Sequence, residues 1–262
     1  MPLTAFQREV AGLLAANRNP NSHVAGGAPV NRSDTSPRYS ADIDIFRDVE
    51  DAVATSARLD TQCLTSLGFQ VDIKIQMSSH FRAEVRRGED FLKLDWSANA
   101  AFRFFPAIPD AVFGYCLHTA DLATNKVIAM ADRAEIRDLL DVLYYDAGYL
   151  PLGQLVWAAC GKDLGYTPES LIQMLNRHAV IQPHQLRAER LTREIDPLEL
   201  KTRWTDARDR AIELCNKLPS EDVGALYLNA SGEPPIVDPD SADFHLLRRH
   251  LGAVCGAWPE IS

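Results

Sequence analysis

The stretch SPRYSADIDIF, Ser36 to Phe46, determines how the first half of this chain is interpreted. Asp42 and Asp44 alternate with Ile43 and Ile45, and a period of two is typical of a β-strand. Side chains of a strand alternate between its faces, so the two aspartates share one face and the isoleucines the other. Two carboxylates this close repel each other. A divalent cation such as Mg²⁺ or Mn²⁺, which accepts oxygen ligands, would remove that repulsion.

A solvated strand face is the simpler explanation of the same pattern, because an Asp-x-Asp pair is common. Two neighbouring features favour a metal site. Upstream, Gly26 and Gly27 follow a short apolar strand, and glycines let backbone N–H groups approach a phosphate closely. Downstream, Asp95 lies within the alternating stretch FLKLDWS (91–97) and is a candidate third carboxylate.

The composition is that of a globular protein, with 262 residues, 46% of them hydrophobic and 24% charged. The net charge of −9 argues against a protein that coats nucleic acid, although it leaves room for a local basic groove. No apolar run approaches the ~18 residues of a membrane span, so we expect no membrane contact. The five cysteines form no CxxC pair, which predicts reduced thiols in a cytoplasmic protein.

Apolar periodicity divides the chain into two predicted domains. Alternating helices and strands predict a mixed α+β sheet domain over residues 1–117, with a Pro-, Asn- and Ser-rich loop at 28–39. Residues 118–262 are predicted to form a helical domain, with a last helix at 242–252. Helices are expected at 3–17, at 49–68 and after Pro168 and Pro197, and strands at 69–76, 81–88, 90–97 and 100–106.

The order of strand, Gly-Gly turn, loop, Asp-x-Asp strand and later strand aspartate resembles the polymerase-β-like nucleotidyltransferases. The second half narrows this resemblance. DLATNKVIAMADRAEIRDLLDVLYY (121–145), together with AGG and RYSADIDIF, is similar to the AbiEii/AbiGii-type nucleotidyltransferase toxin family. The shared features are the Gly-Gly turn, an R-x-S-x-D-I-D strand, a third carboxylate, a D-L-x-x-x-K helix and R-x-x-x-R-D-x-x-D. Each is weak alone, and beyond residue 145 only helical character matches.

The resemblance implies a Mg²⁺-dependent enzyme that moves a nucleotidyl group from a nucleoside triphosphate (NTP) to an acceptor. In characterised relatives the acceptor is the tRNA 3′ end, and the enzyme is the toxin of a toxin–antitoxin or phage-defence system. It implies Asp42 and Asp44 as metal ligands, and Asp95 as a ligand that also helps deprotonate the acceptor. The residues implied around the nucleotide are Gly26, Gly27, Arg38, Ser40, Lys126, Arg137, Asp138 and Asp141, with Arg38 and Ser40 supporting either the phosphates or the strand turn. A cognate antitoxin protein is the implied partner.

Two other functions stay open. The same site could modify a small molecule or a protein, which the negative net charge favours over tRNA. A catalytically degenerate fold could also serve as a binding module. In its favour, Ala28 and Pro29 stand where the family often supplies a phosphate-binding hydroxyl. Within the second motif, Arg137 and Asp141 lie four residues apart and could simply pair with each other.

Overall fold

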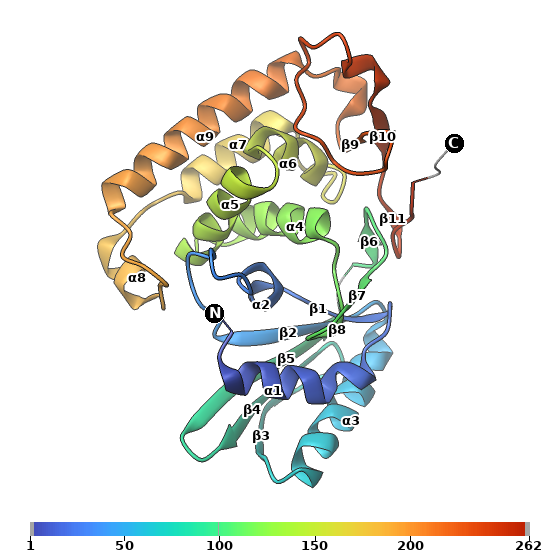
Figure 1. Ribbon diagram of the computed structural model, residues 1–262, viewed down its shortest axis with the longest axis vertical. Coiled ribbons are helices and arrows are strands. Elements are labelled where there is room, and N and C mark those ends of the chain that lie inside the picture. The colour runs from blue at the N-terminus through green and yellow to red at the C-terminus, as the bar shows by residue number, and fades with distance from the viewer. Residues whose placement is uncertain (1–2, 99, 260–262) are drawn as a thin grey trace. The chain divides into compact units, whose positions relative to one another are not determined.

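The computed structural model describes residues 3–98 and 100–259, which divide into two compact units (Figure 1). Of these residues, unit 1 contains those up to Ala101, Phe105–His118 and Val254–Gly256. Unit 2 contains Phe102–Phe104, Thr119–Ala253 and those from Ala257 onward. Each unit is described by itself. The domain boundary predicted between residues 117 and 118 concerns independent folding and stays a prediction.

Unit 1 is organised around a mixed sheet that has seven strands within the described residues, in the order β3-β4-β5-β2-β1-β8-β7. The strands are β1 (Ser22–Ala25), β2 (Asp42–Arg47), β3 (Gln70–Gln76), β4 (His80–Arg87), β5 (Asp90–Ala98), β7 (Ile108–Asp110) and β8 (Gly114–Cys116). The Asp-x-Asp strand β2 is central, antiparallel to β1 and parallel to β5. The predicted strand at Asp42 and its neighbours is therefore confirmed.

Helices α1 (Ala5–Leu14) and α3 (Val53–Ser66) pack on one face of this sheet and form its core. Ile43 and Ile45 are buried there, which accounts for the apolar half of the alternation. Helix α1 begins at Thr4, whose side chain forms a capping box with Gln7. Short helical segments at η1 (Ala15–Asn17), α2 (Gly27–Val30) and η2 (Glu50–Ala52) complete the connections. The loop predicted at 28–39 thus begins inside a short helix.

The opposite face of the central strands is polar. Between β2 and β5, Asp42 pairs with Lys93 and Asp44 pairs with Asp95. Between β4 and β5, Arg82 pairs with Asp95. Residues directly opposite in a ladder share a face, so these charged side chains gather on one side of the sheet. The aspartates of β2 therefore lie on the face opposite to the helical core.

Unit 2 is mainly helical. Its helices are α4 (Thr119–Asp132), α5 (Ile136–Gly148), α6 (Leu152–Ala159), α7 (Pro168–His178), α8 (Pro183–Ala188) and α9 (Pro197–Lys217), with short turns η3 (Ser220–Asp222) and η4 (Phe244–Leu246). The predicted starts at Pro168 and Pro197 are confirmed. Thr167 caps α7 and Asp196 caps α9, each through its side-chain oxygen.

The prediction of a helix at 242–252 is wrong. That region contains η4 and the strand β10 (Arg248–His250), which pairs antiparallel with β9 (Leu226–Leu228). All three residues of β9 are buried, so this strand offers β10 both backbone partners and apolar packing. Tertiary pairing here overrides the leucine spacing that suggested a helix. The strand predicted at 100–106 is also shorter, since β6 covers only Phe102–Arg103; β11 covers Ala253–Val254.

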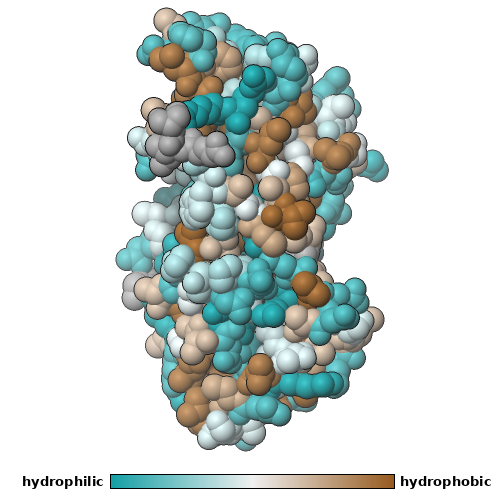
Figure 2. All heavy atoms as spheres, turned by 90° about the vertical axis from the view of Figure 1, so that its right-hand side faces the viewer, coloured by the Kyte–Doolittle hydropathy of each residue, from teal (hydrophilic) through white to brown (hydrophobic). Residues whose placement is uncertain are grey.

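None of the helices among the described residues is long and apolar enough to cross a membrane. On the face shown in Figure 2, hydrophobic residues form separate small patches between hydrophilic ones.

Candidate metal and nucleotide site

The three aspartates predicted to form the metal site lie together in unit 1. One carboxylate oxygen from each of Asp42, Asp44 and Asp95 lies within 4.8 Å of the others. The parallel register of β2 and β5 causes this, because it places Asp44 directly opposite Asp95. Asp42 and Asp44 are half-buried and Asp95 is buried. We call these three residues the Asp42 cluster.

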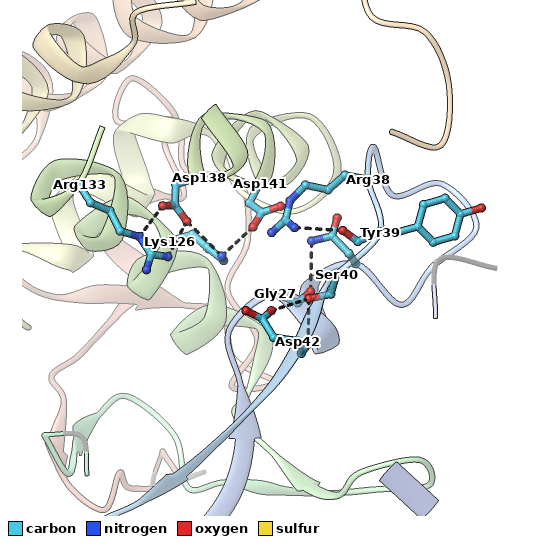
Figure 3. A network of polar contacts seen from close by, with 10 residues as sticks. Gly27, Arg38, Tyr39, Ser40, Asp42, Lys126, Arg133, Asp138 and Asp141 are labelled. Carbon is cyan, nitrogen blue, oxygen red and sulfur yellow. Dashed lines mark hydrogen bonds and ion pairs between the residues drawn. The ribbon is translucent and has the colours of Figure 1, made fainter. Parts of the chain in front are cut away.

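The surroundings of Asp42 fit a divalent cation. Its carboxylate accepts a hydrogen bond from the Ser40 hydroxyl at 3.3 Å, and the same hydroxyl lies 3.1 Å from the Asp42 carbonyl oxygen (Figure 3). Among the residues that the structure describes, no cationic side chain contacts Asp42. Mg²⁺ is usually held by one or two carboxylates together with substrate phosphates. The donor set of the Asp42 cluster therefore suits Mg²⁺ or Mn²⁺.

The Gly-Gly turn packs directly against the Asp-x-Asp strand. Gly26 has a φ of +68°, and a Cβ there would lie 2.0 Å from Oδ2 of Asp44. A Cβ on Gly27 would lie 2.6 Å from the Ser40 hydroxyl and 3.2 Å from a guanidinium nitrogen of Arg38. Both glycines are thus required by the close approach of side chains from the adjoining segment. Their contact with a triphosphate stays a prediction.

Arg38 and Ser40 lie at the entry to β2. Both are buried, and Arg38 donates from Nη1 to the backbone carbonyl of Tyr39 at 3.2 Å. The Ser40 carbonyl accepts a hydrogen bond from Gln7 of α1 at 2.8 Å. The resemblance left two roles open for Arg38 and Ser40, binding of the phosphates or support of the strand turn. Their contacts in unit 1 are those of support for the strand turn.

The sequence analysis missed two partners of Asp95. Nε2 of His80 and Nε of Arg82 both lie 2.8 Å from Oδ1 of Asp95. A signal for this contact exists in the sequence, because Gly88 and Glu89 form the short turn between β4 and β5. Counting back from that turn pairs Arg82 with Asp95, as the observed register does.

Lys126 lies in unit 2, where it bridges two carboxylates of α5. Its ammonium is 3.2 Å from Asp138 and 2.7 Å from Asp141, and all three side chains are almost fully buried (Figure 3). Arg133 adds a second cation, with Nε 2.8 Å from Asp138. We call Lys126, Arg133, Asp138 and Asp141 the Lys126 cluster. It joins α4 to α5, and the predicted contact of Lys126 with a triphosphate stays a prediction.

Arg137 behaves differently from Lys126. Its side chain is half-buried and forms no ion pair or hydrogen bond with any residue that the structure describes. Its Nε is buried without an acceptor. The pairing of Arg137 with Asp141 that the spacing allowed is therefore not seen, because Asp141 contacts Lys126 instead. Arg137 retains donors that an anion could occupy.

Asp121, the first residue of the D-L-x-x-x-K motif, has a local structural role in unit 2. Its Oδ1 lies 2.6 Å from Nζ of Lys162 and accepts the backbone N–H of Phe104 at 2.8 Å. Burial lowers the pKa of Lys162, while Asp121 raises it by favouring the charged ammonium. Lys162 also donates to Asn125 at 2.7 Å. These contacts fix the first turns of α4.

Comparison with solved structures identifies the fold. MenT4, a nucleotidyltransferase toxin from Mycobacterium tuberculosis, superposes with a TM-score of 0.59 at 16% identity, over 82% of this chain and 83% of that one. JHP933 from Helicobacter pylori gives a TM-score of 0.48 at 17% identity, over 80% of this chain and 93% of that one, and no conclusion rests on it. At the level of sequence, no family model and no curated protein matches.

The likeness to MenT4 shows that this chain has a nucleotidyltransferase fold. The predicted α+β architecture, a mixed sheet with flanking helices and a helical C-terminal part, is confirmed. The predicted resemblance to nucleotidyltransferase toxins is also confirmed, at the level of the fold.

Proposed function

We propose that this chain is a metal-dependent nucleotidyltransferase that uses an NTP and releases pyrophosphate. The observation that supports this most is the Asp42 cluster, which gathers three carboxylates on the polar face of a sheet with a nucleotidyltransferase fold. Its donor atoms suit Mg²⁺ or Mn²⁺. A solvated strand face explains the cluster less well, because Asp95 is buried rather than exposed.

In the proposed reaction, a hydroxyl oxygen of the acceptor attacks the α-phosphorus of the NTP. A new oxygen–phosphorus bond forms, the bond from the α-phosphorus to the oxygen bridging to the β-phosphate breaks, and pyrophosphate leaves with that electron pair. Asp42 and Asp44 hold the metal, which when bound stabilises negative charge on the phosphate oxygens. Asp95 takes the acceptor proton at Oδ2, since His80 and Arg82 contact its Oδ1.

The second motif contributes the proposed phosphate ligands. This part rests on the resemblance, which assigns Lys126 and Arg137 to the triphosphate and makes Asp138 and Asp141 part of the same motif. The contacts within unit 2 favour Arg137 as the stronger candidate, because its guanidinium keeps unused donors. Lys126 already neutralises two buried carboxylates, so its first role is to hold α4 against α5.

For the acceptor we propose the 3′ end of tRNA, with the chain acting as the toxin of a toxin–antitoxin pair. The fold shared with MenT4, itself a nucleotidyltransferase toxin, supports this choice. So does the polar sheet face near Asp95, which is mixed in charge rather than acidic throughout. Its charged residues on β3, β4 and β5 are Asp72, Lys74, Arg82, Glu84, Arg86 and Lys93. A small-molecule acceptor is the second candidate, favoured by the net charge of −9.

A label-transfer experiment tests this function. The purified protein is incubated with each α-labelled NTP, Mg²⁺ or Mn²⁺ and total tRNA, with chelator and Asp44→Ala controls. We expect label on tRNA from the wild type, and none with chelator or from the variant. Label on small molecules alone would move the proposal to the second candidate. Absence of any transfer, or equal transfer by Asp44→Ala, would contradict the enzymatic function.

A further inference from the structure

We propose that Arg82 and His80 are positioning residues that reserve Asp95 for the acceptor and leave the metal to Asp42 and Asp44. This inference rests on the proposed function and deepens it, because it divides the work within the Asp42 cluster. It concerns two residues of β4 that the sequence motifs do not include.

The geometry of the contact supports it. Both donors reach the same atom, Oδ1 of Asp95, and each does so at 2.8 Å. Arg82 lies directly opposite Asp95 in the ladder, while His80 lies two residues away on the same face, opposite Ser97. The Asp95 side chain is 10% exposed, against 42% for Arg82 and 32% for His80. The two donors therefore lie on the solvent side of a largely covered carboxylate.

Two donors on one oxygen leave the other oxygen available. A carboxylate oxygen has two lone-pair sites, so the Arg82 N–H and the His80 N–H, in its Nε2-protonated tautomer, occupy both sites of Oδ1. Oδ2 of Asp95 accepts no hydrogen bond from the residues that the structure describes. A single available oxygen can bind the acceptor proton or a metal, but it cannot chelate a metal through both oxygens.

The charge of Arg82 decides between these two uses. A guanidinium 2.8 Å from Asp95 repels a divalent cation at the same carboxylate and offsets its attraction. Lys93 lies opposite Asp42 in the ladder, but Lys93 is exposed and forms no ion pair with Asp42 among the described residues. We therefore infer that divalent metal binds mainly to the β2 aspartates, while Arg82 keeps Asp95 oriented for the incoming hydroxyl.

This division of roles predicts that removing the charge of Arg82 changes metal binding and nucleotidyl transfer in opposite directions. If Arg82 were an ordinary supporting residue, its removal would weaken both metal binding and transfer, or change neither. If it reserves Asp95, removing its charge lets Asp95 join the metal. Metal binding then becomes tighter, while transfer becomes slower.

The test compares Arg82→Gln with Arg87→Gln in the full chain. Arg87 lies on the same strand but on its opposite face, where it pairs with Glu9 at 2.8 Å and stacks over Phe69. Mn²⁺ binding is measured by electron paramagnetic resonance without nucleotide, and transfer by single-turnover label transfer. We expect Arg82→Gln to bind Mn²⁺ about 3- to 10-fold more tightly. Its transfer rate should fall ~10- to 100-fold at saturating NTP, as expected when a reacting group is no longer held in place.

Arg87→Gln should leave both measurements unchanged. Arg82→Lys should return Mn²⁺ affinity to the wild-type value, because the charge is restored, with partial recovery of transfer. His80→Asn removes the second hydrogen bond to Asp95 and should lower transfer by a smaller factor. This variant gives a separate test if Arg82→Gln does not fold. Mn²⁺ binding by Arg82→Gln that is equal to or weaker than the wild type would overturn the inference, while wild-type transfer would still uphold the proposed function. A wild type that neither binds Mn²⁺ nor transfers label would overturn both.

Discussion

The Asp42 cluster of unit 1 and the Lys126 cluster of unit 2 both gather carboxylates, but they balance charge differently. In the Lys126 cluster, both carboxylates are fully buried and each contacts a cation of this chain. In the Asp42 cluster, three carboxylates lie within reach of one another, and Arg82 and His80 contact only one oxygen of Asp95. Asp42 and Asp44 are also half-exposed.

This difference distinguishes charges that stabilise the fold from charges that a bound ligand would neutralise. Burying an ionised group is costly unless a partner of opposite charge accompanies it, so a buried cluster supplies its own counter-ions. In the Asp42 cluster, water solvates the half-exposed Asp42 and Asp44, while the buried Asp95 contacts Arg82 and His80. Such a cluster gains most when a cation arrives from outside. The first arrangement therefore stabilises a fold, and the second is available for chemistry.

The largest expected effect is on activity at the Asp42 cluster. Asp44→Asn removes one negative charge and one metal ligand, so nucleotidyl transfer should fall by about 10³-fold. Stability in urea should change far less than it does in the Lys126 cluster, because Asp44 is half-exposed to water. Asp72→Asn, an exposed aspartate on β3, is the matched control and should change neither quantity. A large loss of stability in Asp44→Asn would erase the contrast between the clusters.

The second prediction concerns stability at the Lys126 cluster. Lys126→Met leaves Asp138 and Asp141 buried with too little positive charge, so the free energy of unfolding should fall by about 3–5 kcal/mol. Urea denaturation followed by tryptophan fluorescence measures this change.

A triple variant provides the control. Combining Lys126→Met with Asp138→Asn and Asp141→Asn removes both sides of the pairing, and most of the lost stability should return. If the triple variant is stable but transfers no nucleotide, then at least one of these three residues also serves the nucleotide, as the resemblance implies. A single variant as stable as the wild type would show that the Lys126 cluster is not structural.

The third prediction sharpens the account of the Gly-Gly turn. Gly26 and Gly68 both have positive φ, at +68° and +83°, so an alanine at either position adds backbone strain. Only Gly26→Ala also places a Cβ against the carboxylate of Asp44, whereas Gly68 has open space around it. Mn²⁺ affinity should therefore fall ~10- to 100-fold in Gly26→Ala and stay unchanged in Gly68→Ala. Equal Mn²⁺ affinity in the two variants would mean that the turn does not position Asp44.

The central strands could be predicted from the sequence because their alternation is strict. Ile43 and Ile45 face the core and Asp42 and Asp44 the other side, as a period of two requires. The helix starts at Pro168 and Pro197 were equally visible, because capping is local chemistry. The proximity of Asp95 to Asp42 and Asp44 could be predicted only from the family resemblance. The local spacing of residues does not determine the register between parallel strands.

What could not be predicted depends on contacts between distant segments. The partners of Lys126 lie on the next helix, and only the packing of α4 against α5 brings them together. The strand β10 was mistaken for part of a helix because its buried partner β9 lies about twenty residues upstream. The strands β7 and β8 are three residues each, too short for periodicity to reveal.

The smallest expected effect tests the hydroxyl at the entry to β2. Ser40→Ala removes the donor to the Asp42 carboxylate, whose 3.3 Å length indicates a weak bond. Losing ~1 kcal/mol corresponds to a Mn²⁺ affinity about 3- to 5-fold lower. Ser66→Ala, which removes a hydroxyl bonded to a helix carbonyl of α3, should leave that affinity unchanged. A loss of Mn²⁺ affinity as large as the one expected for Gly26→Ala would mean that Ser40 belongs to the metal site itself. A small loss would mean that the carboxylates alone make the Asp42 cluster a ligand site.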